Sequence, residues 1–339
     1  MKLNRIGVDL AKQVFQIHGV DSHEQVKCRK QLKRSQMLDF FRQQEPCLVA
    51  MEACGSAHYW ARELCQLGHE VRLIAPQFVK PYVKSGKNDA NDAEAICEAA
   101  SRPSMRYVTV KSAEQQASQS VHRVRSRLIR ARTALLNEIR GLLGEFGLVA
   151  ARPGIASTRA LLQQALDEVD RLPGELNEML LLLQSELHDQ DARVKQLDGM
   201  LQRQVDADER VQRLLKIEGV GPISATAIVA SVGDARQFRS ARQFAAWLGL
   251  VPSQHSSGGK ERLGGISKKG DSYPRMLVIH GARAALNACK TKTDRRSEWV
   301  NQLQARRNTN IATVALANKN ARIIWAILSK GESYQPAEA

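Results

Sequence analysis

The sequence lacks the cysteine spacings that are typical of zinc sites. It contains no C-x-x-C pair and no cluster of cysteine with histidine at zinc-ligand spacing. We therefore expect neither a structural zinc ion nor a disulfide, and free thiols in a reducing compartment. The six cysteines are Cys28, Cys47, Cys54, Cys65, Cys97 and Cys289.

Long apolar runs and a nucleotide-binding loop are also missing. No apolar run approaches the roughly 20 residues that span a bilayer, and the first residues contain no signal-peptide core. We therefore expect a soluble, cytoplasmic protein without a membrane partner. No G-x-x-x-x-G-K-[ST] sequence occurs, which argues against an NTP-driven enzyme. Aromatic residues make up only 5% of the chain, so base stacking should contribute less to binding than backbone contacts.

Acidic residues are outnumbered by basic ones. The 339 residues contain 50 Lys and Arg against 35 Asp and Glu, a formal net charge of +15. Because such a charge attracts phosphates, nucleic acid is the leading partner, with a membrane surface as the alternative, and binding should weaken as salt rises.

The pattern of apolar residues predicts an α/β region followed by a mainly helical one. In the first hundred residues we predict three strands, then helix, strand, helix, strand and helix. Long amphipathic helices over 112–146 and 176–215 follow, and such helices pack as an antiparallel hairpin or pair with a second subunit. A Gly-Val-Gly turn precedes a helix that starts at Pro222. The predicted domains are 1–110, 111–212 and 213–332, with a tail over 333–339.

Four carboxylates stand at informative positions. Asp89 and Asp92 are three residues apart at the start of a predicted helix, so they share one face. Asp9 and Glu52 each end an apolar strand, where a buried acid needs a partner. Together they could hold one or two Mg²⁺ ions. The alternative is structural: solvated strand ends, with Asp89 as a helix N-cap and Asp92 favoured by the helix dipole.

Three segments resemble one family of recombinases. "GVDLAK", "MEACGS" and "KNDANDAEAI" are similar to the Asp-Glu-Asp-Asp motif of the bridge-RNA-guided transposases of insertion-sequence families 110 and 1111, the Piv/MooV-like recombinases. The resemblance extends over nearly the whole chain. It implies a RuvC-like (ribonuclease-H-like) mixed sheet with flanking helices, a helical coiled-coil middle and a helical C-terminal domain. It also implies that Asp9, Glu52, Asp89 and Asp92 are catalytic ligands of Mg²⁺.

The same resemblance singles out a serine. By composition alone, none of Ser253, Ser256, Ser257, Ser267 and Ser272 stands out, because no activating Ser-His-Asp or Ser-Lys spacing is present. In the family a nucleophilic serine follows "GLxP", and "GLVPSQHSSGG" places Ser257 there, with Ser256 as its neighbour. The implied reaction is RNA-guided DNA strand exchange through a phosphoserine link. Implied partners are donor and target DNA, a structured noncoding guide RNA, and further copies of the chain as a dimer or a dimer of dimers.

Basic and glycine-rich segments predict contacts with nucleic acid. The helix over 121–140 carries a surplus of arginine, whose planar fork suits phosphate. "GVGPISA" resembles a helix-hairpin-helix, whose turn and helix start can hold a phosphate. The alternative readings are a solvated helix face and a purely steric turn. The predicted contact residues are Arg123, Arg125, Arg127, Arg130, Arg132, Gly219, Gly221, Lys260, Lys268 and Lys269.

Two other functions fit the same features. A RuvC-like junction nuclease would use metal-activated water and no serine. A noncatalytic nucleic-acid-binding scaffold would use the four acids only structurally. A covalent protein–DNA adduct would indicate the recombinase, cleavage without an adduct the nuclease, and binding without cleavage the scaffold.

Overall fold

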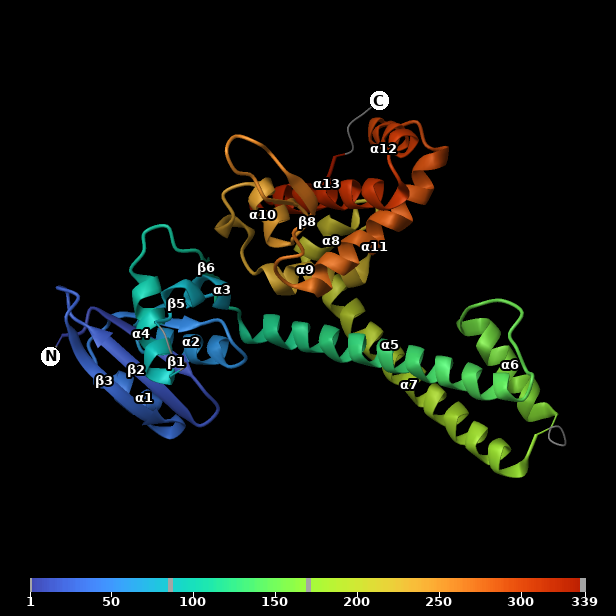
Figure 1. Cartoon of the computed structure of the whole chain (residues 1–339), viewed down its shortest axis with the longest axis horizontal. Helices are drawn as coiled ribbons and strands as arrows, with labels where there is room; N and C mark the ends of the chain where they lie inside the picture. Colours follow the sequence, from blue (N-terminus) through green and yellow to red (C-terminus); the bar gives the residue numbers. More distant parts are fainter. Residues whose placement is uncertain (1, 85–87, 169–171, 336–339) are drawn as a thin grey trace. The chain divides into compact units, whose positions relative to one another are not determined.

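The computed structural model describes residues 2–84, 88–168 and 172–335, and it divides into two compact units (Figure 1). The first unit contains residues 1–116 and the second residues 117–339. Each unit has hydrophobic cores of its own. We describe them separately.

A six-stranded mixed sheet forms the centre of the first unit. The strand order is β3-β2-β1-β4-β5-β6; β1, β2 and β3 are antiparallel neighbours, whereas β4 and β5 run parallel to β1. The predicted order of strands and helices is confirmed, with a four-residue helix added after β5 and a short β6 added at the edge. The strands are β1 (Arg5–Leu10), β2 (Val14–Val20), β3 (Val26–Lys33), β4 (Leu48–Glu52), β5 (Glu70–Ile74) and β6 (Tyr107–Val108).

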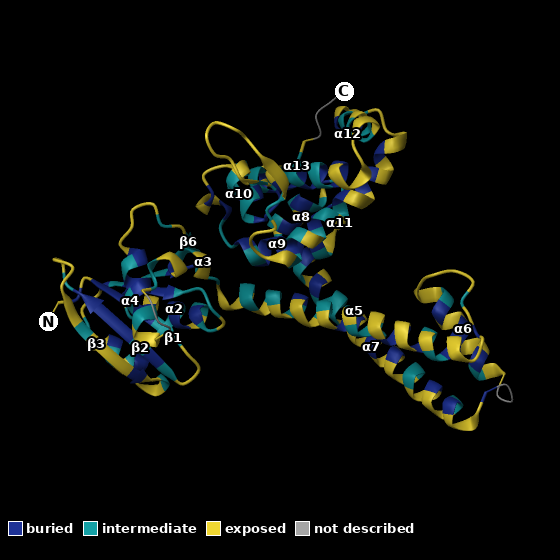
Figure 2. Cartoon of the chain, in the orientation of Figure 1, coloured by how far each residue is buried: buried dark blue, intermediate teal, exposed yellow. Residues whose placement is uncertain are grey.

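Helices cover both faces of this sheet. Alternate residues of a strand point to opposite faces, so Ile6 and Val8 enter a core with α1 and α2, while Arg5 and Gly7 face α4. The strands β1 and β4 are largely buried, and β3 is an exposed edge strand (Figure 2). The helices of this unit are α1 (Met37–Arg42), α2 (Ala57–Gln66), α3 (Pro76–Val79) and α4 (Asp89–Ala100).

Two long antiparallel helices begin the second unit's fold. They are α5 (Ala113–Glu145) and α7 (Gly174–Ala207). The side-chain contacts Ser118–Gln204, Arg125–Asp198 and Arg132–Asp191 show that residue numbers rise on one helix as they fall on the other. The hairpin within one chain, one of the two arrangements that the sequence left open, is present.

The helical region differs from its prediction in two places. The segment 176–215 is not one helix, because α7 ends at Ala207 and α8 (Glu209–Leu215) restarts with the Asp208 carboxylate capping the Arg210 N–H. An additional helix, α6 (Ile155–Asp167), packs on α5 and α7. Its buried residues Thr158, Leu161, Leu162 and Ala165 have helical spacing, so the sequence did contain this signal.

The C-terminal part is mostly helical, as predicted, and contains one small β-hairpin. Its long helix α13 (Thr309–Lys330) contacts α10 and α11. Among the described residues α13 alone is long and apolar enough to cross a membrane, but Leu316, Ala317 and Ile324 lie in the protein core. The other elements are α9 (Pro222–Val232), α10 (Ala241–Trp247), β7 (Pro252–Gln254), β8 (Leu263–Ile266), α11 (Ser272–Ala288) and α12 (Arg295–Arg306).

Candidate metal centre and nucleic-acid interface

A glycine in β1 allows α4 to pack closely against this strand. A Cβ atom on Gly7 would lie 2.2 Å from the carbonyl oxygen of Ala93, so only glycine permits this close approach. Asp9 follows two residues later on the same face of the strand. On the helix, Asp92 directly precedes Ala93 and Asp89 lies about one turn before it, which places both near Asp9 at the carboxyl end of β1.

Three of the four predicted acids meet there. One carboxylate oxygen from each of Asp9, Asp89 and Asp92 lies within 4.8 Å of the others. Glu52 is outside this group of three, but it ends β4, which is paired with β1 in parallel register. The N-cap of α4 is Asn88, whose side chain accepts the Ala90 N–H; the alternative reading of Asp89 as the cap is therefore wrong.

The acids repel one another at this place. Burial, followed by the charges of Asp92, Asp89 and Glu52, raises the pKa of Asp9 to about 6. Burial and the charge of Asp92 also raise the pKa of Glu52. Within residues 2–84, 88–168 and 172–335, no Lys or Arg forms an ion pair with any of these four carboxylates. The repulsion in such a cluster is relieved when a cation binds or when one carboxyl takes up a proton, as the raised pKa of Asp9 reflects.

This set of ligand atoms fits Mg²⁺. Carboxylate oxygens are the hard donors that Mg²⁺ prefers, and one or two carboxylates that leave room for water and phosphate oxygens are the usual arrangement. Asp89 is exposed and Asp9 and Asp92 are half-buried, so solvent reaches the cluster. The residues that would hold the ion are Asp9, Asp89 and Asp92, with Glu52 beside them.

Ser257 lies at the tip of the β7–β8 hairpin in the second unit. The Lys260 N–H donates to the Ser257 carbonyl over 3.1 Å, and Gly258 and Gly259 between them have φ values of 56° and 75°. Two consecutive positive φ angles define a type I′ turn, which matches the twist of a hairpin. The Gly/Ser/Lys-rich segment is therefore an ordered hairpin, with Ser257 exposed at its end.

The two neighbouring serines differ in their hydrogen bonds. The Ser256 hydroxyl accepts the Arg262 N–H over 3.2 Å and the Gln254 side-chain N–H over 2.9 Å. Among the residues that the structure describes, no partner binds the Ser257 hydroxyl. Ser256 thus helps to close the hairpin, whereas the Ser257 hydroxyl is available to a substrate.

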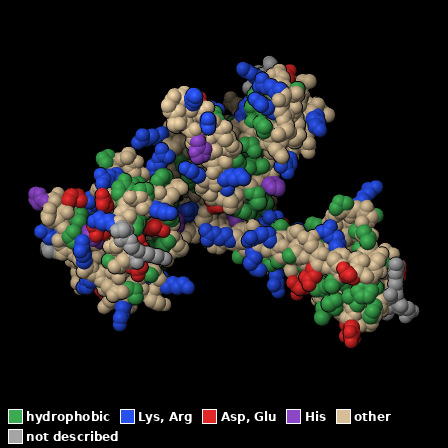
Figure 3. All heavy atoms as spheres, viewed as in Figure 1, with side chains coloured by type: hydrophobic (Ala, Val, Ile, Leu, Met, Phe, Trp, Pro, Cys, Tyr) green, Lys and Arg blue, Asp and Glu red, His purple; other side chains and the backbone are tan. Residues whose placement is uncertain are grey.

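The arginines of α5 fall into two groups. Arg125 pairs with Asp198 and Arg132 with Asp191, so both contribute to the contact between α5 and α7. Arg123, Arg127 and Arg130 are exposed, and none has an ion pair within the described ranges. Lys and Arg side chains gather along the N-terminal half of α5 (Figure 3). The three exposed arginines are therefore the ones available to phosphate.

Comparison with known proteins identifies the family. A model of DEDD transposases of IS110, described as "Transposase", matches residues 6–147, and the model "Transposase IS116/IS110/IS902 family" matches residues 211–298. A "Probable family 20 transposase" of Pseudomonas aeruginosa is 67% identical over 99% of this chain and 100% of its own length. The chain belongs to the IS110/IS1111 family of transposases.

Transposases of two named elements are similar over almost the whole chain. The transposase for insertion sequence element IS1111A of Coxiella burnetii is 47% identical over 97% of this chain and 91% of its own length. The transposase for IS1328 of Yersinia enterocolitica is 43% identical over 96% and 97%. This transposase is thus a DNA-processing enzyme of a mobile element, as the sequence resemblance implied.

The Gly-Val-Gly turn of the transposase is packed on one side. The carbonyl of Gly219 approaches α11 so closely that a Cβ on Gly281 would lie 1.7 Å from it. Gly221, by contrast, is exposed and precedes α9 as its N-cap, without a side-chain cap of its own. Gly219 therefore serves helix packing, and the exposed start of α9 is the part of the turn that could contact a phosphate.

The predicted lysines, Lys260, Lys268 and Lys269, have exposed side chains, and hydrogen bonds fix the backbone around them. Lys260 belongs to the hairpin turn next to Ser257. The Lys268 N–H donates to the Gly249 carbonyl over 3.1 Å, and the Lys269 carbonyl accepts from Arg275 over 2.9 Å. These contacts fix the backbone and leave the ammonium groups in solvent.

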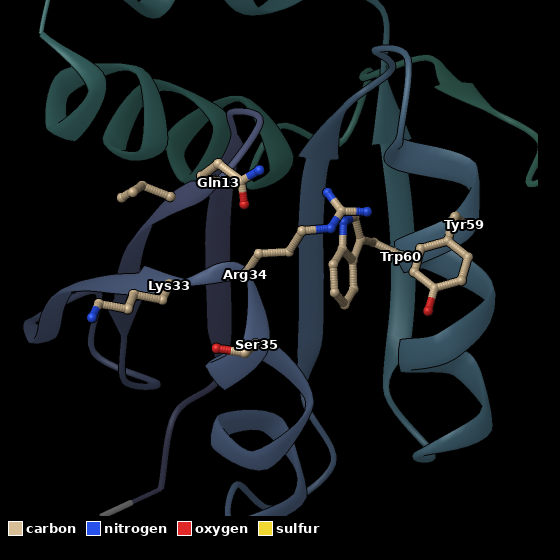
Figure 4. A pocket seen from close by; sticks show the side chains of 7 residues that line it. Gln13, Lys33, Arg34, Ser35, Tyr59 and Trp60 are labelled. Atoms are coloured by element: carbon tan, nitrogen blue, oxygen red, sulfur yellow. The ribbon is translucent and has the colours of Figure 1, made fainter.

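A basic and aromatic hollow of about 600 Å³ lies on the first unit, and the sequence analysis missed it (Figure 4). The Arg34 guanidinium stacks over the Trp60 ring, 5.1 Å from its centroid, and Lys33 precedes it at the end of β3. Tyr59, next to Trp60 on α2, is 41% exposed. The adjacent pair Tyr59-Trp60, in a chain with few aromatic residues, was the signal available in the sequence.

Proposed function

We propose that this transposase cuts and rejoins DNA through a covalent phosphoserine link, using a RuvC-like metal centre and Ser257. The observation that supports this proposal most directly is the group of three carboxylates, Asp9, Asp89 and Asp92, with ligand oxygens within 4.8 Å of one another. They come from segments about 80 residues apart in the sequence, and Asp9 and Glu52 have raised pKa values. A structural role does not require acids to be collected in this way.

The proposed step transfers one phosphodiester bond. The Ser257 Oγ attacks the scissile phosphorus, a new P–O bond forms, and the P–O bond to the departing DNA oxygen breaks. Serine gives its proton to water, and the departing oxygen takes one up and becomes a hydroxyl. Mg²⁺ at the carboxylates would polarise the phosphate and stabilise the developing charge. Because the link keeps the phosphodiester energy, a second DNA hydroxyl can reverse the step without ATP.

The hydrogen bonds favour Ser257 over Ser256 as the nucleophile. The Ser256 hydroxyl accepts two hydrogen bonds that close the hairpin, so moving it to a phosphate would break both. Ser257 stands at the exposed end of the turn, and its side chain is not needed to hold the hairpin together. The neighbouring Lys260 ammonium can attract the phosphate.

The partners in this proposal are donor and target DNA and a structured noncoding guide RNA. Base pairing of the RNA selects the DNA sites, while the protein contacts backbone phosphates through Arg123, Arg127 and Arg130. We propose that the paired helices α5 and α7 act as the coiled-coil arm of the family and that the chain works as a dimer or a dimer of dimers in the cytoplasm. The formal charge of +15 supports polyanionic partners.

Formation of a covalent adduct tests the proposal. The full chain is incubated with DNA carrying the element junction, the transcribed RNA from beside the gene, and Mg²⁺, and the adduct is detected on a denaturing gel. We expect an adduct with the natural protein and with Ser256→Ala, and none with Ser257→Ala or Asp9→Asn. Binding of DNA by Ser257→Ala should be unchanged, because the hydroxyl contributes to chemistry and not to affinity.

Each other result identifies an alternative. An adduct with Ser257→Ala but not with Ser256→Ala would assign the nucleophile to Ser256. Cleavage without any adduct would indicate a junction nuclease that uses activated water. Binding without cleavage in Mg²⁺ or Mn²⁺ would indicate a noncatalytic scaffold.

A further inference from the structure

A second hollow, of about 480 Å³, lies between α5, α9 and α11 within the second unit. One stripe of α5 forms its wall, since Gln119, His122, Arg123, Ser126 and Arg130 recur at the spacing of a single helix face. Its volume lies in the range of small-ligand sites. Neither the carboxylates nor the Ser257 hairpin belongs to it.

The hollow contains a buried imidazole nitrogen without a partner. His122 is 2% exposed; its Nδ1 lies 3.2 Å from the Tyr273 hydroxyl, while its Nε2 has no partner among the described residues. Arg125 also forms a hydrogen bond with Tyr273, and an arginine can only donate. The Tyr273 oxygen can accept from Arg125 and still donate its own proton to Nδ1 of His122; in this arrangement the proton of the neutral imidazole is on Nε2.

In this tautomer the Nε2–H calls for an acceptor from outside the protein. A buried N–H without a partner is unfavourable, and native proteins rarely leave one. Burial and the charge of Arg125 lower the pKa of His122 to about 4, so the ring is neutral at physiological pH and carries a single N–H. An oxygen or ring nitrogen of a bound molecule would satisfy it.

The rim of the hollow selects an anion. Arg123 and Arg130 are exposed and have no ion pair in the described part of the chain. The N-terminus of α11, which has 17 residues, opens on the same hollow. Asp271 is the one carboxylate in the lining, and it is occupied as the N-cap of α11, where it accepts the Tyr273 N–H over 2.9 Å. The two arginine charges outweigh the single carboxylate, which is already engaged as a helix cap. The hollow therefore favours an anionic group such as phosphate.

The hollow also offers an apolar contact. Met276, one turn into α11, is 41% exposed at the lining. A flexible thioether chain packs against flat, irregular surfaces such as a base. These three features match the parts of a nucleotide. The buried Nε2–H suits an acceptor on the base, the two arginines suit the phosphate, and Met276 suits the apolar face of the base ring.

We propose that this hollow binds one unpaired nucleotide of a single-stranded segment, with its phosphate on Arg123 and Arg130 and an acceptor of its base on the His122 Nε2–H. The inference rests on the proposed function for the presence of a nucleic acid. It assigns that nucleic acid a binding site, here called the nucleotide seat, that is separate from the proposed catalytic residues. Guide RNA and displaced DNA share this chemistry, and the experiment below distinguishes them.

Fluorescence anisotropy with the full chain tests the seat. The probes are labelled single strands about 12 nucleotides long, one of DNA and one of RNA with the same sequence. We expect Arg123→Ala and Arg130→Ala each to weaken binding about tenfold, as the loss of a hydrogen bond to a charged group does. Arg140→Ala removes the same charge from the same helix, and Arg140 does not line the hollow, so we expect a loss of about threefold or less.

The histidine supplies a second measurement that does not depend on a variant. In protein labelled with nitrogen-15 histidine, the Nε2–H signal of His122 should be present in the free protein and should shift when the tighter-binding strand is added. The signal is assigned by its absence in His122→Phe, or by its sensitivity to Tyr273→Phe if His122→Phe does not fold.

The outcomes separate the two proposals. Equal losses for the three arginine variants, or an Nε2–H signal that does not move on saturation, would overturn the nucleotide seat while nucleic-acid binding stands. Failure of the natural protein to bind either strand would refute the proposed partners themselves. Tighter binding of the RNA strand would identify the guide RNA as the occupant, and tighter binding of the DNA strand would identify displaced DNA.

Discussion

The pKa of Asp9 is the most direct measure of how closely the acids converge. In the structure, burial and three neighbouring carboxylates raise it from the ordinary 3.8 to about 6. A rise of this size corresponds to about 3 kcal/mol of lost preference for the ionised form. Because Asp9 is only half-buried, water screens part of the repulsion, and we expect about 1–2 kcal/mol to remain as an effect on stability.

The sign of the effect on stability follows from linkage. The folded protein binds this proton more tightly than the unfolded chain, so ionisation of Asp9 destabilises the fold. In metal-free buffer this contribution is absent below pH about 4, grows as pH rises to about 6, and is constant above it. Asp9→Asn removes the contribution, so the variant should be more stable than the natural protein at pH 7 and equally stable at pH 4.

Metal binding reverses the order at neutral pH. The proton on Asp9 must leave before the carboxylate can hold Mg²⁺, so the apparent affinity should fall about tenfold for each pH unit below about 6 and level off above it. Added Mg²⁺ should then stabilise the natural protein and leave Asp9→Asn unchanged. Thermal melting with and without Mg²⁺ at several pH values measures both effects.

Carbon-13 NMR of labelled aspartate measures the pKa itself. The Asp9 signal is identified by its loss in Asp9→Asn and titrated in the presence of EDTA. Asp92→Asn should lower the Asp9 pKa, since Asp92 is its strongest charged neighbour. Glu94→Gln is the matched control: it removes a carboxylate from the same helix, one that pairs with Lys84 instead. An Asp9 midpoint near 4, or an equal response to both variants, would refute the convergence.

Two further predictions concern the supports of the sites. Gly7→Ala should lower the free energy of unfolding by about 1–3 kcal/mol and weaken Mg²⁺ binding, because the new methyl group would push α4 away from β1. Gly55→Ala is the control: its methyl group would meet open space, so the free energy of unfolding should change by no more than about 0.5 kcal/mol. Arg132→Met should lower the free energy of unfolding by up to about 1 kcal/mol, as urea titration would show, through loss of its pair with Asp191. Arg132→Met should also weaken the binding of single strands less than Arg123→Ala does. An equal loss of affinity would show that Arg132 contacts nucleic acid after all.

Much of the first unit could be predicted from local patterns. Alternation of apolar residues gave the strands, and helical spacing with caps gave α2 and α4. The break at Asp208 was missed because an aspartate cap inside a long polar–apolar pattern looks like another surface residue. The hairpin at Ser257 was missed because glycine and serine allow many backbone shapes, and only its cross-strand hydrogen bonds fix one.

The sequence by itself determined the residue types and the charge: an excess of cations, four acids at element ends, and a serine beside glycines. Tertiary structure alone decided which of them act together. It brought Asp9 to Asp89 and Asp92 through the close approach at Gly7, and it engaged Arg125 and Arg132 in the contact between two helices while Arg123 and Arg130 stayed exposed. The physical reason is range. Periodicity and capping depend on neighbours within a few residues, whereas electrostatic coupling and burial depend on distances in space that packing sets.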